Sequence, residues 1–215
     1  MIRILIADDH RIVREGLKQI LSEESDIAVM GNAANGLEAL KLIREQPFDV
    51  ALMDMSMPGR SGIELIKQVK GEKPKLAILV LSMHKEEQYA VRALKAGASG
   101  YLTKESAPEQ LVAAIRKVAC GGIFISSGVA ERLALELGGN HDADPHTLLS
   151  DREYQIFRMI VSGTPVGGIA DELALSVKTV STHKTRILQK MRMTSSAELI
   201  HYAIRHQLVD MPGDS

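Results

Sequence analysis

Residues 49–59 read DVALMDMSMPG, an apolar run that ends on a carboxylate, Asp54, with Pro58 and Gly59 close behind. An ionised acid at the end of a buried segment is costly unless a partner neutralises it. The stretch therefore indicates a strand that leads into a polar site.

Short apolar runs alternate with longer segments of helical period in the first half of the chain. The runs are continuously apolar, as expected when helices cover both faces of a sheet. Five successive β–α units predict an α/β fold with a doubly wound, five-stranded parallel sheet. The predicted strands are Ile2–Ala7, Ile27–Gly31, Val50–Asp54, Leu76–Leu81 and Gly100–Leu102.

The length of 215 residues favours two domains. Gly121-Gly122 closes the first block, and GGNHDADPHT (138–147) has the Gly, Pro and acidic composition of a linker. A short helical piece around Val129–Leu137 can lie between them. From Leu149 onward the pattern is wholly helical, which predicts a small all-α second domain. The predicted division is a first domain at 1–122, a linker at 123–147, a second domain at 148–209 and a tail at 210–215.

Composition and charge bound the class of protein. With 45% apolar and 25% charged residues the chain is typical of a soluble globular protein. It has no membrane-spanning run, no signal peptide and one cysteine, Cys120, so we expect a cytoplasmic protein without an internal disulfide. Residues 148–209 carry eight Lys/Arg against five Asp/Glu, so the positive surplus lies in the C-terminal third.

Five polar residues lie at or just beyond the carboxyl ends of the predicted strands. In doubly wound sheets the functional crevice lies beyond the carboxyl ends of the strands, so we expect these side chains to gather there. Crowded carboxylates resist ionisation unless a cation lies among them, and oxygen donors suit Mg²⁺. Such a site can receive a phosphoryl group, with Asp54 as the nucleophile. The residues are Asp8, Asp9, Asp54, Ser82 and Lys104.

Each acid has a simpler alternative. Asp8 or Asp9 alone could be a helix N-cap, and a strand-end aspartate such as Asp54 could be a turn former. The coincidence of five polar residues at successive strand ends favours a functional site over these separate explanations.

The segments IADDH (6–10), LMDMSMPGRSG (52–62), LSMH (81–84) and AGASGYLTK (96–104) resemble the receiver domain of bacterial two-component response regulators. The resemblance implies a flavodoxin-like sheet of strand order 2-1-3-4-5. It also implies that Asp54 accepts a phosphoryl group from a sensor histidine kinase.

The same resemblance implies a role for each site residue. Asp9 would bind Mg²⁺ directly and Asp8 through water, with the Ser56 carbonyl completing the protein ligands. Lys104 would pair with the phosphoryl oxygens. Ser82 and Tyr101 would form a switch in which the hydroxyl swings to the phosphoryl group and the ring turns inward. An amphipathic ring at a strand edge is the alternative for Tyr101.

Residues 176–192, SVKTVSTHKTRILQKMR, form a predicted basic helix without an acidic residue. The preceding GIADELALS (168–176) supplies a short amphipathic helix, a tight break and Ser176 as N-cap, which is helix–turn–helix punctuation. An ordinary solvated basic face is the alternative. The apolar stripe of this helix is predicted to be Val177, Val180, Ile187 and Met191.

The stretches LSDREYQIFRMIVSG (149–163) and IADELALSVKTVSTHKTRILQKM (169–191) resemble the LuxR-type DNA-binding domain of the NarL/FixJ class. The resemblance implies that Ser181, Thr182 and Thr185 face base edges. The residues expected near phosphates or elsewhere on the DNA-binding face are Lys178, His183, Lys184, Arg186 and Lys190. Val166-Gly167-Gly168 stands where the family usually has a polar–Lys–Glu run, which indicates a weaker grip on DNA.

The function predicted from the sequence is a transcription factor switched by phosphorylation, with a sensor histidine kinase, promoter DNA and Mg²⁺ as partners and no membrane association. The small positive surplus predicts weak binding by one module, so we expect the active form to be a homodimer. Leu199, Ile200, Ala203 and Ile204 could form the joining face or part of the core.

Two other functions compete with this prediction. One is a phosphohydrolase with an aspartate nucleophile, although such enzymes have a second acid where this chain has Ser56. The other is a constitutive DNA-binding module that is not phosphorylated, against which the complete set of site residues argues. We therefore expect a regulator rather than an enzyme.

Overall fold

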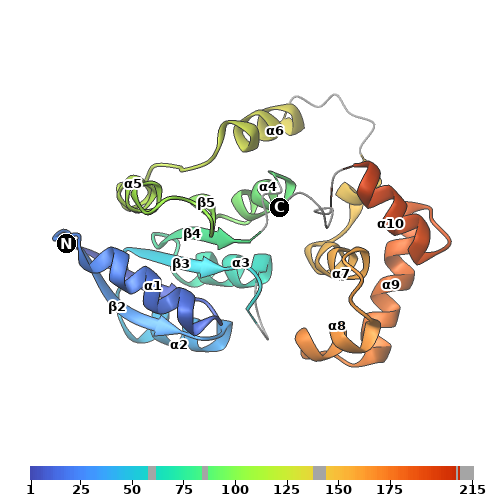
Figure 1. The fold of residues 1–215 in the computed structure, drawn as a ribbon, viewed down its shortest axis with the longest axis horizontal. Coiled ribbons are helices and arrows are strands. Elements are labelled where there is room, and N and C mark those ends of the chain that lie inside the picture. The colour runs from blue at the N-terminus through green and yellow to red at the C-terminus, as the bar shows by residue number, and fades with distance from the viewer. Residues whose placement is uncertain (58–61, 84–86, 138–143, 207, 209–215) are drawn as a thin grey trace. The chain divides into compact units, whose positions relative to one another are not determined.

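A computed structural model describes residues 1–57, 62–83, 87–137, 144–206 and 208. The chain forms two compact units, Met1–Gly138 and Gly139–Ser215. The first contains a five-stranded parallel sheet of order β2-β1-β3-β4-β5, which confirms the predicted topology (Figure 1). Its strands are β1 (Ile2–Ala7), β2 (Ile27–Ala33), β3 (Val50–Asp54), β4 (Ala77–Ser82) and β5 (Gly100–Thr103). Its helices are α1 (Arg11–Ser22), α2 (Gly36–Glu45), α3 (Gly62–Glu72), α4 (Glu87–Lys95), α5 (Pro108–Ala119) and α6 (Ser127–Leu137).

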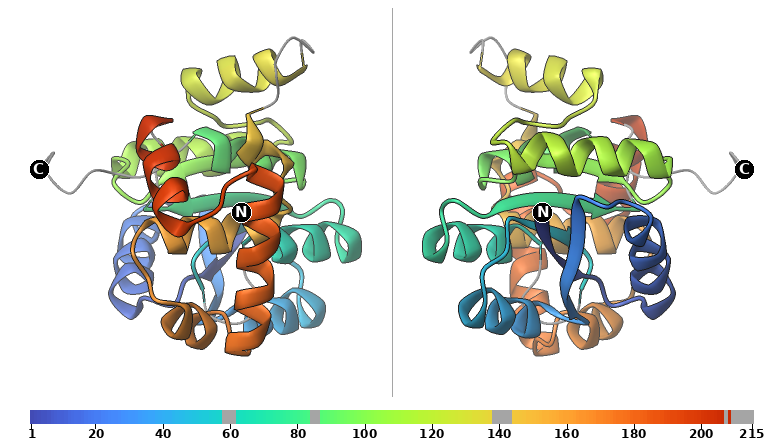
Figure 2. Two further views of the ribbon diagram at one scale, coloured as in Figure 1. Left: turned by 90° about the vertical axis from the view of Figure 1, so that its right-hand side faces the viewer. Right: turned by 90° about the vertical axis from the view of Figure 1, so that its left-hand side faces the viewer.

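Helices cover both faces of the sheet (Figure 2). Ile4, Leu52 and Leu79 share one apolar core with Leu21 of α1 and Ile115 of α5. Because successive strand residues point to opposite faces, their neighbours face α2, α3 and α4. All five residues of β3 are buried, which explains why the strands are continuously apolar.

The chain beyond α5 stays with the first unit. Phe124 runs beside the outer edge of β5, where its carbonyl accepts from Tyr101 N at 3.0 Å and its N–H donates to Ser99 O at 3.0 Å. A Cβ at Gly100 would lie 2.8 Å from the Phe124 carbonyl, so this approach requires glycine. Helix α6 then packs against α4. The boundary between the units thus falls within the segment 123–147 that the sequence assigned to a linker.

In the second unit the regular elements of the described residues (144–206 and 208) are all helical. Its elements are the 3-10 helix η1 (Pro145–Leu148) and the helices α7 (Asp151–Val161), α8 (Val166–Glu172), α9 (Val177–Met191) and α10 (Ser196–Arg205). The predicted breaks near 163, 175 and 194 are present, and Gly163, Ala174 and Arg192 take positive φ there. Tyr154 and Phe157 of α7 are fully buried at the centre of this unit.

The burial of residues along α10 partly answers whether its apolar side chains belong to the core or to a joining face, which the sequence left open. Leu199 and Ala203 are buried in the core of the second unit, whereas Ile204 is exposed and Ile200 is half-buried. Within the described stretches of both units, no helix has the length and apolar character required to cross a bilayer.

Candidate functional site

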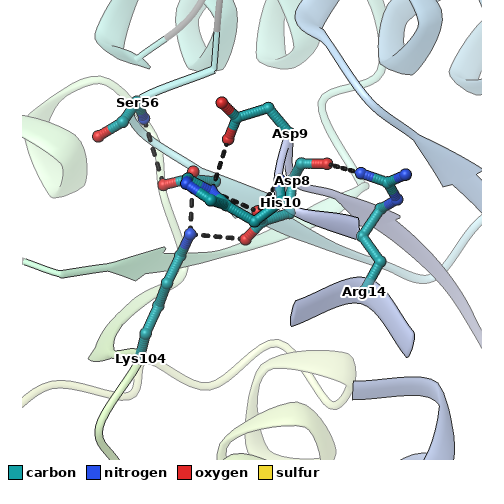
Figure 3. A network of polar contacts seen from close by, with 7 residues as sticks. Asp8, Asp9, His10, Arg14, Ser56 and Lys104 are labelled. Carbon is teal, nitrogen blue, oxygen red and sulfur yellow. Dashed lines mark hydrogen bonds and ion pairs between the residues drawn. The ribbon is translucent and has the colours of Figure 1, made fainter. Parts of the chain in front are cut away.

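Three charged side chains meet at the carboxyl ends of the strands (Figure 3). The Lys104 ammonium lies 2.7 Å from Asp8 Oδ2 and 3.0 Å from Asp54 Oδ2. Both carboxylates are 1% exposed. The backbone fixes the lysine, because Lys104 N donates to the Ser82 carbonyl at 2.8 Å. The strand ends therefore hold one buried cation between two buried acids.

Burial and charge oppose each other within this group. Burial raises the pKa of Asp54, the Lys104 ammonium counteracts this, and the neighbouring Asp8 raises the pKa further. Burial alone would lower the pKa of Lys104, but its hydrogen bond to Asp8 and its pairing with Asp54 raise it overall. Asp54 Oδ1 also accepts from Ser56 N at 3.2 Å. The result is a buried carboxylate whose charge depends on one lysine.

Asp9 and His10 complete a cluster of possible metal ligands. His10 Nδ1 lies 2.9 Å from Asp9 Oδ1 and 3.3 Å from Asp8 Oδ1, and His10 N donates to Asp8 Oδ1 at 2.8 Å. One ligand atom from each of Asp8, Asp9, His10 and Asp54 falls within 4.8 Å of the others. Asp8 Oδ2 and Asp54 Oδ2 are buried and make no hydrogen bond of good geometry beyond their ion pairs with Lys104. This donor set fits a divalent cation. The three acids are the candidate ligands named from the sequence, and His10 is not among them.

Ser82 and Tyr101 lie together beside the acid cluster. Ser82 is fully buried at the end of β4, and the Tyr101 ring on β5 is only 6% exposed. Burial raises the pKa of Tyr101 above its ordinary value, and a hydrogen bond with Ser82 partly opposes this rise. The Tyr101 ring is thus already buried in this structure, whereas the resemblance implied that it turns inward only after phosphorylation.

Helix α9 of the second unit carries the predicted DNA-binding residues. Ser176 caps it as predicted, since its hydroxyl accepts from Thr179 N at 3.0 Å. Val180, Ile187 and Met191 are buried, as the stripe predicts. Val177 is 55% exposed, so its assignment to that stripe was wrong. It is the first residue of the helix, ahead of the turns that pack against α7 and α8.

The polar face of α9 is largely open to solvent. Thr182 Oγ1 donates to the Lys178 carbonyl at 2.9 Å and Thr185 Oγ1 to the Ser181 carbonyl at 3.1 Å, so these hydroxyls retain acceptor capacity. His183 and Lys184 are half-buried. The predicted residues that are exposed are Lys178, Ser181, Thr182, Thr185, Arg186 and Lys190.

Lys190 also has a partner within its own unit. Its ammonium donates to Glu153 Oε2 at 2.6 Å, and Glu153 is buried. Glu153 and Ser150 form a capping box at the start of α7, in which Ser150 N donates to Glu153 Oε2 at 2.8 Å. Sequence reasoning did not find this pair, although Ser150 followed by Glu153 carries the S-x-x-E signal of a capping box. Its link to Lys190 depends on the tertiary fold.

Comparison with known families assigns both units. Residues 4–116 match the response regulator receiver domain, and residues 147–203 match the bacterial regulatory proteins of the luxR family. The chain belongs to the NarL/FixJ family of response regulators.

Named relatives match nearly the full length of this response regulator. It is 41% identical to response regulator GacA of Pseudomonas aeruginosa over 98% of this chain and 99% of the relative. It is 40% identical to response regulator UvrY of Escherichia coli over 97% of this chain and 96% of that one. The oxygen regulatory protein NreC of Staphylococcus carnosus is 39% identical, over 97% and 99% of the two chains.

Solved structures of RcsB from Salmonella share the fold of this response regulator. One has a TM-score of 0.72 at 27% identity, covering 95% of this chain and 97% of that one. Another, bound to the promoter rprA in the presence of the phosphomimetic BeF3⁻, has a TM-score of 0.67 at 27% identity, covering 94% and 97%. The similar proteins thus include named response regulators and a solved structure, RcsB, that is bound to promoter DNA.

Glu153 gives this response regulator a testable pH dependence. Burial alone would raise the pKa of Glu153, but its bonds to Lys190 and Ser150 lower it overall. The stability that Glu153 contributes is therefore present above the ordinary carboxyl pKa and lost as pH falls through the lowered value. We expect Glu153→Gln to cost the second unit about 1–2 kcal/mol at pH 7 through the lost charge-assisted bond.

Hydrogen exchange of peptides from α7 and α9 measures this effect in the full chain. The difference between wild type and Glu153→Gln should shrink as the pH falls from 7 to below about 4. The exposed Glu172 in the same unit offers the matched control, and Glu172→Gln should change the stability by less than about 0.5 kcal/mol. A Glu153→Gln difference that does not vary with pH would contradict the assigned role.

Proposed function

We propose that this response regulator is a transcription factor switched by phosphorylation of Asp54. The observation that carries the proposal is the contact of Lys104 Nζ with Asp8 and Asp54, at 2.7 and 3.0 Å, at the edge of the sheet. Phosphoryl transfer needs positioning and charge neutralisation more than covalent help from the protein. A buried acid with a cation on one side and further acids on the other suits that chemistry.

Mg²⁺ is the metal that we assign to the acid cluster. Asp8, Asp9, Asp54 and the Ser56 carbonyl would hold it, and the buried carboxylate oxygens of Asp8 and Asp54 suit a hard cation. When bound, the ion supplies charge neutralisation at the transferring oxygens. We propose that a sensor histidine kinase provides the phosphoryl group.

The protein's own groups respond to the new charge at Asp54. An Asp54 oxygen attacks phosphorus and forms the acyl phosphate bond, while the bond to the donor's leaving group breaks. The Lys104 ammonium, which already reaches Asp54, pairs with the phosphoryl oxygens. The buried Ser82 hydroxyl donates to a phosphoryl oxygen, which changes its hydrogen bond with Tyr101. Packing around the Tyr101 ring then reports the charge at Asp54.

We propose that helix α9 is the recognition helix that contacts promoter DNA. Ser181, Thr182 and Thr185 lie exposed on its outer face, suited to contact base edges. Lys178, Lys184 and Arg186, together with His183, suit phosphate contacts, and Lys190 adds charge while bonded to Glu153. RcsB structures with promoter DNA, and one of two RcsB dimers on two DNAs, support this role and a dimeric active form. We propose a cytoplasmic location, since the proposed promoter DNA lies in that compartment.

The test uses the full chain, acetyl phosphate and Mg²⁺. Intact-mass analysis should show the addition of one phosphoryl group, and Asp54→Asn should abolish it. Asp26→Asn, at an exposed carboxylate of the same unit, should leave it unchanged. Size-exclusion chromatography and DNA binding to a site selected from a random library should then show dimerisation and tighter binding only after phosphorylation.

The other two candidate functions give different results in the same assay. A phosphohydrolase would turn over phosphate esters continuously with Mg²⁺, and we expect no such turnover. A constitutive DNA-binding module would bind DNA with equal affinity in the presence and absence of phosphodonor. Either result, or a mass increase that survives Asp54→Asn, would refute the proposed function.

The two glycines of α8 should weaken the grip on DNA in a measurable way. A Cβ at Gly167 would meet nothing within 4 Å, so a larger side chain fits there. We expect Gly167→Ala to stabilise the second unit by about 0.5–1 kcal/mol, since glycine disfavours a helix. Gly167→Lys should also tighten DNA binding and steepen its dependence on salt by about one unit of log–log slope, as one added phosphate contact does.

Gly167→Glu is the matched control for that prediction. It gives a similar gain in helix propensity with the opposite charge, so its DNA affinity should fall below that of Gly167→Ala. Fluorescence anisotropy with a labelled duplex at several salt concentrations measures both the affinity and the slope. Equal affinities for the lysine and glutamate variants would show that position 167 does not approach DNA.

A further inference from the structure

We infer that His10 supplies a nitrogen ligand to the acid cluster, so that the site favours Co²⁺, Ni²⁺ and related transition-metal ions over Mg²⁺ more strongly than its carboxylates alone would. This inference rests on the proposed metal site and adds a residue that determines its selectivity. The observations that carry it are the direction of the His10 ring, the spacing of the donor atoms and the burial of Asp8 and Asp54.

The His10 side chain points at the acids and performs no capping task. His10 precedes the first residue of α1, yet its side chain makes no cap hydrogen bond. The backbone N–H of His10 donates to Asp8 Oδ1 at 2.8 Å, and the Arg14 guanidinium donates to the Asp8 carbonyl at 2.6 Å. These two bonds hold the backbone so that Nδ1 faces the carboxylates of Asp8 and Asp9 (Figure 3).

The donor atoms have the spacing that one bound ion requires. Adjacent ligands of an octahedral ion with bonds of about 2.1 Å lie about 3 Å apart. His10 Nδ1 lies 2.9 Å from Asp9 Oδ1 and 3.3 Å from Asp8 Oδ1. The Asp54 carboxylate belongs to the same group of donors within 4.8 Å. Two carboxylate oxygens of this group, on Asp8 and Asp54, are buried and directed at Lys104.

The chemical type of the fourth donor, the His10 imidazole, determines which metal ions bind more tightly. Mg²⁺ prefers oxygen ligands and keeps its water, so a nearby imidazole adds little to its binding. Imidazole nitrogen suits the later first-row ions, whose affinity for mixed nitrogen and oxygen sites rises from Mn²⁺ towards Ni²⁺. The His10 side chain is 61% exposed, so it can adjust to an ion without repacking the core.

The same distances also fit a second role, in which His10 Nδ1–H donates to Asp9 and only orients it. His10→Asn separates the two roles, because the asparagine amide keeps a donor near Asp9 but is a poor ligand for these ions. If His10 is a nitrogen ligand, His10→Asn should lose affinity for transition-metal ions only. An orienting donor predicts either no loss or an equal loss for Mg²⁺ and Ni²⁺.

Calorimetric titration of the full chain with Mg²⁺, Co²⁺ and Ni²⁺ measures the selectivity. We expect His10→Asn to weaken Co²⁺ and Ni²⁺ binding by about tenfold or more and Mg²⁺ binding by less than about twofold. His201→Asn, at an exposed histidine of α10, should change none of the three. Asp9→Asn should weaken all three, which places the ions at the acid cluster.

Pulsed electron paramagnetic resonance of the Mn²⁺-loaded protein tests the ligation directly. A bound imidazole should give nitrogen modulation that His10→Asn removes and His201→Asn retains. Absence of this modulation in the wild type, or equal loss of Mg²⁺ and Ni²⁺ affinity in His10→Asn, would overturn the inference. Failure of the proposed function is read separately, as absence of the phosphoryl mass increase with Mg²⁺ in the wild type.

Discussion

Replacing Lys104 with methionine should destabilise the first unit more than any other single change at the site. Asp8 and Asp54 are 1% exposed, and Lys104 is the cation that both contact. Removing one partner from a buried ion pair leaves uncompensated charge and costs about 3–5 kcal/mol. Hydrogen exchange of peptides from β1 and β3, in metal-free buffer at neutral pH, measures the loss in the full chain.

An exposed lysine provides the control for this prediction. The Lys41 side chain is 73% exposed and lies 3.9 Å from Glu45, so Lys41→Met should change the stability by less than about 0.5 kcal/mol. Addition of Mg²⁺ should restore part of the stability of Lys104→Met, because a bound cation replaces the missing charge. Equal stabilities of the Lys41 and Lys104 variants would contradict the electrostatic account of the site.

Asp54→Asn should act in the opposite direction and stabilise the metal-free protein. Burial raises the pKa of Asp54, so the unfolded chain ionises first as pH rises and the folded state loses stability across that interval. An amide does not titrate, and Lys104 keeps Asp8 as its partner. We expect Asp54→Asn to gain about 1–2 kcal/mol at neutral pH. Urea-dependent exchange of peptides from β3 and β4 measures it.

Two further measurements test this prediction: the stabilisation by Mg²⁺ and the control variant Asp26→Asn. Mg²⁺ should stabilise the wild type more than Asp54→Asn, because the variant lacks one charged ligand of the proposed metal site. Asp26→Asn should give no gain, because the hydrogen bond with Arg116 lowers the pKa of Asp26 and the ionised form is favoured there. A metal-free Asp54→Asn protein less stable than the wild type would show that the carboxylate is not under electrostatic strain.

The sheet and the placement of its acids were predictable from local patterns. Continuously apolar strands buried on both faces, such as Val50–Asp54, follow from the requirement to pack helices on each side. Strand ends of a parallel sheet share one edge, so Asp8, Asp54 and Lys104 had to meet there. Turn residues such as Gly163 and the cap Ser176 marked the helix boundaries of the second unit.

The features that were missed depend on contacts between distant segments. The bond between Glu153 and Lys190 joins two helices whose relative position no local signal specifies. Val177 fits the apolar period of α9, but periodicity does not show where the packing partner of a helix begins. The contact of α6 with α4 depends on tertiary packing in the same way, whereas the sequence placed the start of the linker directly after Gly121-Gly122.

The strip of chain at Phe124 has a practical consequence for dissecting the protein. Strand β5 is the last in the sheet, and Phe124 satisfies the backbone groups of Ser99 and Tyr101 that point outward from it. A fragment that stops at Gly122 would leave the outer edge of β5 unpaired. The free backbone N–H and C=O groups of such an edge can pair with another molecule. Self-association of such a fragment would then be an artefact of the cut, and a receiver fragment should extend through residue 138.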